Sequence, residues 1–153
     1  MKLLKYNIFI LASLLLVLGL QGCAKADPNF VHDDCFISQL IANGTRSGSI
    51  TDFIGTIYEY DKNGQLLEPG FTPEQAAGGS GVITFIISPE DADKIDLTAC
   101  YLRATLTFDE YITPSMSGRH NILCTEENPE GKVFTVRSGE NTVRKYRVMG
   151  VYE

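Results

Sequence analysis

The sequence predicts an all-β fold, and three observations support this prediction. Short segments rich in β-branched and aromatic residues recur along the chain, and clusters of Gly, Pro, Asn and Asp separate them. Apolar and polar residues alternate in residues 101–108, which is typical of a strand with one buried face. No segment has a sustained apolar pattern at helical spacing. We therefore expect a single β-sandwich domain.

Residues 1–22 are typical of a cleaved secretory signal peptide. Lys2 and Lys5 provide positive charge, and an uncharged apolar run follows over residues 8–20. This run fits the ~7–15 residues of a secretory apolar core and is shorter than the ~20 residues that span a bilayer. The alternative interpretation is a short membrane anchor or a buried helix.

The stretch LQGC, which ends at Cys23, resembles the lipobox of bacterial lipoproteins. Leu20 and Gly22 match that motif, whereas Gln21 stands where Ala or Ser is commoner. The resemblance implies that signal peptidase II cleaves before Cys23 and that its thiol carries a diacylglycerol. Stable attachment needs more than one acyl chain, which a lipidated lipoprotein cysteine supplies. Cys23 is therefore the expected lipid attachment site, testable by palmitate incorporation.

The chain then divides into a flexible tether, residues 23–34, and a β-sandwich domain, residues 35–153. The tether is polar, contains Pro28 and has no periodicity. Its acidic residues, Asp27, Asp33 and Asp34, resemble surface-export signals of Bacteroidetes lipoproteins. We therefore expect a cell-envelope protein, lipid-anchored in the outer membrane and exposed at the surface.

Strands are expected in order along the domain. Residues 35–42 form the first, and residues 50–60 follow, closed by a hairpin turn at Asn63-Gly64. Residues 65–81 form a long loop. Residues 82–88 are almost wholly apolar, which predicts a strand covered on both faces and ended by Pro89.

The second half of the domain continues this pattern. Residues 89–100 are polar and have room for one helical turn; strand 101–108 and a turn-rich bend, residues 109–121, follow. Residues 132–152 predict a hairpin joined by SGEN. In its second strand Tyr146, Val148 and Gly150 share one face, opposite Lys145, Arg147 and Met149.

This closing hairpin resembles that of the immunoglobulin- and cadherin-like modules of Bacteroidetes surface lipoproteins. Phe134, Val136, Tyr146 and Val148 occupy the matching apolar positions. Upstream, the segment Asp96-Leu97-Thr98 and the bend at residues 114–118 resemble the middle of the same module. The resemblance covers roughly residues 35–150 and departs from the module in the longer loop of residues 50–80 and in the cysteines. It implies an immunoglobulin-like β-sandwich and a cell-surface setting, and no reaction.

Three cysteines remain in an oxidising compartment: Cys35, Cys100 and Cys124. They form at most one disulfide, and all three are instead expected to be small buried apolar residues. A zinc site is not expected, because the sequence has no CxxC spacing and only His32 and His120 to assist. Calcium between loops 89–93 and 108–110 is left open.

The sequence offers little for catalysis, and we expect no enzyme, no catalytic residues and no cofactor. No nucleophile-elbow, P-loop or dinucleotide motif occurs. His32 falls in the tether, and His120 is expected to be exposed in a bend. A hydrolase is a weaker alternative, because carboxylates at strand ends could meet in space; these are Glu59, Asp61, Asp109 and Glu110.

The net charge of −6 argues against a nucleic-acid partner, which needs a basic face. A basic cluster stands out nevertheless, formed by Arg137, Arg144, Lys145 and Arg147. Such a cluster is usually cross-strand pairing and protection of a sheet edge. The alternative is a contact surface for an anionic glycan or a partner, with sugar-stacking aromatics in Tyr58, Tyr60, Tyr101 and Tyr111.

Together these features predict a lipid-anchored, non-catalytic accessory or binding module of the cell envelope. Glycans are the expected ligand class, by association with lipoproteins of carbohydrate uptake, and the ligand residues are not predicted. The main alternative is a structural or adhesive subunit that docks to another envelope protein by strand addition.

Overall fold

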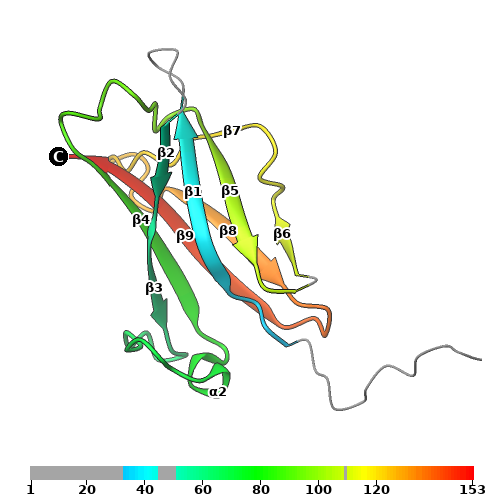
Figure 1. Cartoon of the computed structure of the whole chain (residues 1–153). Helices are drawn as coiled ribbons and strands as arrows, with labels where there is room; N and C mark the ends of the chain where they lie inside the picture. The colour runs from blue at the N-terminus through cyan, green and yellow to red at the C-terminus, as the bar shows by residue number, and fades with distance from the viewer. Residues whose placement is uncertain (1–32, 45–50, 109) are drawn as a thin grey trace, which may run out of the picture. The chain divides into compact units, whose positions relative to one another are not determined.

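Two β-sheets packed against each other make up the described part of the chain, as the sequence predicts (Figure 1). The structure is a computed structural model that describes residues 33–44, 51–108 and 110–153. All of them belong to one compact unit, His32–Glu153. The predicted signal peptide and Cys23 lie outside the described residues. No helix in the described ranges is long and apolar enough to cross a membrane.

The smaller sheet has four antiparallel strands in the order β2-β1-β5-β7. Its strands are β1 (Ile37–Gly44), β2 (Thr51–Ile54), β5 (Cys100–Leu106) and β7 (Arg119–His120). The predicted alternation in β5 is confirmed, because Cys100 and Leu102 are buried while Tyr101 and Arg103 are exposed. The prediction that Phe108 continues this buried face is wrong, because Phe108 lies beyond the end of β5 and is 47% exposed.

The larger sheet has five strands in the order β3-β4-β9-β8-β6. Its strands are β3 (Thr56–Tyr60), β4 (Ser80–Ile87), β6 (Tyr111–Thr113), β8 (Lys132–Arg137) and β9 (Val143–Tyr152). β4 and β9 pair in parallel and the other neighbours pair antiparallel. The parallel pair differs from the antiparallel sheets that define an immunoglobulin domain. The prediction that β4 is covered on both faces holds at Val82, which is 7% exposed, and is wrong at Ile86, which is 60% exposed.

The core fills the space between the inner faces of the two sheets. Tyr146 and Val148 of β9 are fully buried there, which agrees with the predicted face. Gly150 continues this face, and a Cβ atom at that position would lie 2.8 Å from the Leu97 side chain. Further members come from both sheets and from the connections; they include Leu40, Ile83, Phe85, Ile95, Ile122 and Phe134.

One continuous segment, residues 51–60, provides an edge strand of each sheet. β2 is the last strand of the smaller sheet and β3 the last strand of the larger one, and only Gly55 separates them (Figure 1). A Cβ atom at Gly55 would lie 2.6 Å from the Ile83 side chain and 2.8 Å from the Phe85 ring. The chain can cross from sheet to sheet here because glycine leaves that space free.

The connection between β3 and β4 begins with the predicted turn. Gly64 has φ of 77°, and Tyr60 forms an isolated bridge with Leu66 across the turn. Further on, a short helix, α2 (Pro73–Ala76), replaces the expected unstructured loop. Thr72 and Gln75 form a capping box at its start. The helical turn expected within residues 89–100 is absent from the described residues, where turns take its place.

Candidate binding site beside strand β3

Arg144 does not belong to a surface cluster, so this part of the sequence prediction is wrong. Its residue is only 2% exposed, because β9 turns it toward the core on the same face as Tyr146. A buried cation is stable only if it is paired and its donors are bonded. The surroundings of Arg144 meet both conditions.

The guanidinium of Arg144 binds four groups from three segments. Its Nε donates to Glu59 Oε2 at 2.8 Å, and its Nη2 lies 2.6 Å from the same oxygen. Nη1 donates to the Ala76 carbonyl at 2.7 Å. Nη2 also donates to the carbonyls of Tyr60 at 3.0 Å and Ser80 at 2.8 Å. These bonds join β9 to β3, to α2 and to the start of β4.

Tyr146 completes this buried network. Its hydroxyl donates to Glu59 Oε1 at 2.6 Å and accepts a bond from the Ile37 amide at 3.2 Å. Burial raises the pKa of Glu59, while the Tyr146 hydroxyl and Arg144 favour its ionised form. Burial and the neighbouring carboxylate raise the pKa of Tyr146 as well. Glu59 is thus bonded at both oxygens, which suits a structural ion pair better than an acid catalyst.

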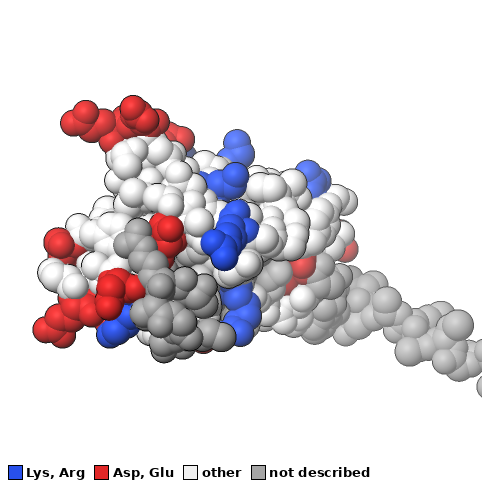
Figure 2. Space-filling model, turned by 90° about the horizontal axis from the view of Figure 1, so that it is seen from above, with Lys and Arg blue, Asp and Glu red and all other residues white. Residues whose placement is uncertain are grey.

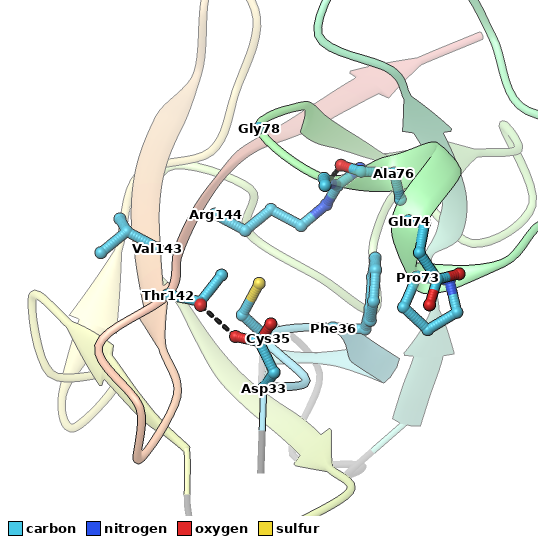
Figure 3. A pocket seen from close by; sticks show the side chains of 11 residues that line it. Asp33, Cys35, Phe36, Pro73, Glu74, Ala76, Gly78, Thr142, Val143 and Arg144 are labelled. Carbon is cyan, nitrogen blue, oxygen red and sulfur yellow. Dashed lines mark hydrogen bonds between the residues drawn. The ribbon is translucent and has the colours of Figure 1, made fainter. Parts of the chain in front are cut away.

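A small cavity of about 150 Å³ lies beside this network, between β9, α2 and the residues before β1 (Figure 3). Arg144, Cys35 and Phe36 contribute to its lining, and Asp33 accepts a hydrogen bond from the Thr142 hydroxyl at its rim. Asp33, which the sequence predicts to be part of the tether, thus contacts the domain. Burial raises the pKa of the Cys35 thiol to about 11. A thiol that stays protonated at neutral pH is a poor nucleophile.

Phe36 lines both this cavity and a larger groove. The Arg144 guanidinium carbon lies 5.0 Å from the centre of the Phe36 ring, and the Phe71 ring centre lies 5.6 Å from it. The groove has a volume of about 510 Å³ and mostly apolar walls. Its lining comes from the start of β1, from β3 and from the loop after it, and includes Phe36, Ile57, Tyr58, Leu66, Glu68 and Phe71.

The groove lies beside a strand edge that is open in part. The loop covers the C-terminal end of β3. There the Leu67 amide donates to the Glu59 carbonyl at 2.8 Å, and the Asp61 amide donates to the Gln65 carbonyl at 2.9 Å. The part of β3 that precedes Glu59 pairs only with β4 among the described residues. Exposed apolar side chains lie along the β2–β3 segment and on the loop beside it: Ile54 is 66% exposed, Leu66 52% and Tyr58 40%. Neither Lys nor Pro protects residues 51–60.

The histidine and cysteines that the sequence suggested as candidates for function have neighbours typical of structural residues. His120 is half-buried rather than exposed, because its ring packs edge-on against Phe134 with centres 5.4 Å apart. Cys35, Cys100 and Cys124 are unpaired thiols, and Cys124 is the most exposed of them. No group of metal-binding side chains occurs within the described ranges.

The three described carboxylates at strand ends each bind different partners. Glu59 binds Arg144, whereas Asp61 accepts bonds from the Asn63 and Gln65 amides at 2.8 Å each. Glu110 accepts from the Phe108 amide at 2.7 Å, and Asp109 lies outside the described residues. In loop 89–93, for which the sequence leaves calcium open, Asp91 Oδ1 lies 2.5 Å from Lys94 Nζ in an ion pair.

Sequence reasoning did not identify the groove. Its walls come from three separate segments, within residues 36–38, 57–59 and 66–71, and residues 65–71 carry only the composition of an irregular loop. The one available signal was the apolar pair Leu66-Leu67 directly after a hairpin turn. Comparison of the chain with models of protein families, with curated proteins and with solved structures finds no match.

Proposed function

We propose that this chain is a lipid-anchored, non-catalytic accessory or binding module of the cell envelope, attached to the outer membrane through Cys23 and exposed at the surface. Its partner is an extended segment of another envelope protein, which adds as a strand to the open edge of β3. The observation that carries this proposal is the apolar groove of about 510 Å³ beside that edge. In strand addition, backbone bonds supply affinity and a neighbouring pocket reads the side chains.

The chemistry of the edge defines the segment that it would accept. Alternate side chains of an added strand point to one face, so every second residue would face the groove. The walls formed by Phe36, Ile57 and Phe71 favour apolar side chains there. Glu68 lies among the lining residues and favours a Lys or Arg beside them. We therefore expect an extended, apolar segment that carries at least one basic residue.

A photoreactive residue on the edge tests this proposal. Benzoylphenylalanine replaces Ile54 in the full-length protein within its native envelope, and Ile86 provides the matched control position. Both are isoleucines on strands, 66% and 60% exposed, but Ile86 belongs to β4, an inner strand of the larger sheet, and not to the edge segment. The expected result is a cross-link at position 54 to one other protein, mapped to an extended apolar and basic segment, with no such product from position 86.

Two results would contradict strand addition at this edge. One is an equal yield of the same product from both positions. The other is a product that contains only two copies of this chain, which would indicate self-association. As a further check, Ile54→Lys should abolish the cross-link from a probe at Tyr58, whereas Ile86→Lys should preserve it.

The lipid anchor has a separate test. Cys23→Ala removes the thiol that the lipobox-like stretch assigns to acylation, and it should abolish incorporation of radiolabelled palmitate and release the protein from the membrane fraction. Unchanged labelling would remove Cys23 from the proposal and leave the strand-docking experiment unaffected.

Glycan binding remains a second candidate, favoured by the tyrosines on the outer face of the larger sheet. Tyr58 and Tyr60 lie on the same face of β3, two residues apart, and Tyr58 is 40% exposed. We also keep the immunoglobulin-like relationship as a proposal. The two packed sheets and the edge segment that changes sheet at Gly55 support it, and the parallel β4–β9 pair is its least typical feature.

A further inference from the structure

The outer face of the larger sheet carries cations without an acidic partner. Lys145 and Arg147 point away from the core, because Tyr146 and Val148 between and beside them point into it. Both side chains are exposed, and no carboxylate in the described part of the chain forms an ion pair with either. Residues two apart on a strand are about 7 Å from each other, so the two charges are close.

Tyrosines stand opposite these cations on the same face. The strand register places Tyr58 in line with Arg147, because both pair with Val82 of the intervening strand β4. In the same way Tyr60 is in line with Lys145. Two strand spacings separate the members of each pair, which corresponds to about 10 Å. An aromatic row and a cationic row therefore run side by side along the sheet.

Short side chains lie between and beside the two rows, so the sheet surface is recessed there. Ser80 and Val82 of β4 have small side chains, and Val82 is only 7% exposed. A shallow hollow of about 290 Å³ adjoins the cationic row, and its lining includes Ser80, Gly81, Glu130, Val133, Lys145 and Arg147. Glu130 is the one acidic group in that lining, and it forms no ion pair with the cations among the described residues.

Charges on the face seen in Figure 2 are segregated rather than evenly mixed. In Figure 2, Lys and Arg side chains form a band across the middle of the molecule, whereas most Asp and Glu side chains lie toward its left. The chain as a whole carries a net charge of −6. A nucleic acid, with a phosphate at every step, would meet strong repulsion outside so small a basic area. A ligand with fewer, more widely spaced acidic groups fits better.

We propose that the outer face formed by β3, β4 and β9 binds a polysaccharide that bears carboxylate or sulfate groups. Arg147 and Lys145 bind the acidic groups through charge-assisted hydrogen bonds. The rings of Tyr58 and Tyr60 pack against the apolar faces of neighbouring sugar rings. This inference rests on the glycan-binding candidate, and it shares Tyr58 with the groove proposed for strand docking.

Binding of the full-length protein, kept in detergent, to polygalacturonate at low salt tests the inference. Fully methyl-esterified polygalacturonate provides the same backbone without its charges and should bind much more weakly. Lys145→Gln/Arg147→Gln should lower the affinity for polygalacturonate about tenfold, since two exposed charge contacts are lost. Raising the salt concentration should weaken wild-type binding, because exposed charges are screened. Glu130→Gln should strengthen it.

Charge-matched variants on the other sheet control for nonspecific attraction. Arg103→Gln/Arg119→Gln changes the net charge equally, and both residues are exposed on the smaller sheet. This double variant should retain the wild-type affinity. Equal losses in the two double variants, or equally tight binding of single-stranded DNA, would overturn the inference. Equal binding of the esterified polymer would also overturn it while leaving the glycan candidate standing, whereas no binding of either polymer would remove both.

Discussion

The two faces of β9 give the same kind of residue opposite surroundings. Arg144 faces inward, is 2% exposed and binds Glu59 together with three backbone carbonyls. Arg147, three residues later, faces outward and has no acidic partner among the described residues. An inward cation of this kind holds segments of the fold together, whereas an outward one remains available to a ligand.

The difference shows that position on a strand, and not residue type, decides what a charge does here. Side chains alternate between faces, so a shift of one residue moves a side chain from core to solvent. The cost of removing a charge should therefore be large on the inner face and small on the outer face. The following four experiments test this contrast, beginning with the largest expected effect.

Arg144→Met should lower the free energy of unfolding by about 3–5 kcal/mol, because Glu59 would remain buried without its cation. Urea unfolding followed by circular dichroism measures this loss. The double variant Glu59→Gln/Arg144→Met removes both charges and should be more stable than Arg144→Met alone. If the single variant loses less than about 1 kcal/mol, the buried pair does not hold the fold as described.

The pH dependence of stability provides a test of burial on the inner face of the smaller sheet, through the thiol of Cys100. Burial raises the pKa of this thiol from 9.0 to about 11. Below pH 9 the thiol is neutral in both states; above it the unfolded thiol ionises while the folded thiol keeps its proton. The free energy of unfolding should therefore fall between pH 9 and 11, by up to about 3 kcal/mol from this group.

The control for this titration is Cys100→Ala, whose stability should decline less steeply over the same pH range, as measured by urea unfolding at each pH. Identical slopes for the two proteins would show that the Cys100 thiol ionises as readily in the folded state as in the unfolded state.

Tyr146→Phe should cost about 1–2 kcal/mol, since the ring still fills the core but Glu59 and the Ile37 amide lose a hydrogen-bond partner. The exposed Tyr101, whose hydroxyl accepts a bond from Arg119 at 3.4 Å, serves as control. Tyr101→Phe should leave the urea midpoint nearly unchanged. Similar midpoint shifts for both variants would argue against a special role of the inner hydroxyl.

Lys145→Gln/Arg147→Gln should change the stability by no more than about 0.5 kcal/mol, as is usual for surface positions. Thermal and urea unfolding both measure this. A loss above about 1 kcal/mol would mean that the outer cations contribute to the fold, and their proposed role in binding would then need to be separated from stability.

The sequence was informative wherever a local pattern decides the structure. Alternation located β5 and β9, and the turn residues Asn63-Gly64 located the hairpin after β3. The same alternation could have placed Arg144 inside, since it shares the parity of Tyr146 and Val148. The Thr72–Gln75 capping box was likewise a readable signal for α2.

What the sequence could not provide depends on contacts between distant segments. Glu59 and Arg144 are 85 residues apart, and no local pattern predicts their meeting. The parallel pairing of β4 with β9 and the groove beside β3 follow from how the sheets assemble. His120 was expected to be exposed for the same reason, because its contact with Phe134 comes from the opposite sheet.

The place of β9 has a consequence for when the protein can fold. β9 follows all the other described strands in sequence, yet it lies between β4 and β8 and carries both Arg144 and Tyr146. The larger sheet therefore cannot close until residues 143–152 have left the ribosome. Until then β3 and β4 remain without their central neighbour, and such late, nonlocal pairing is slow.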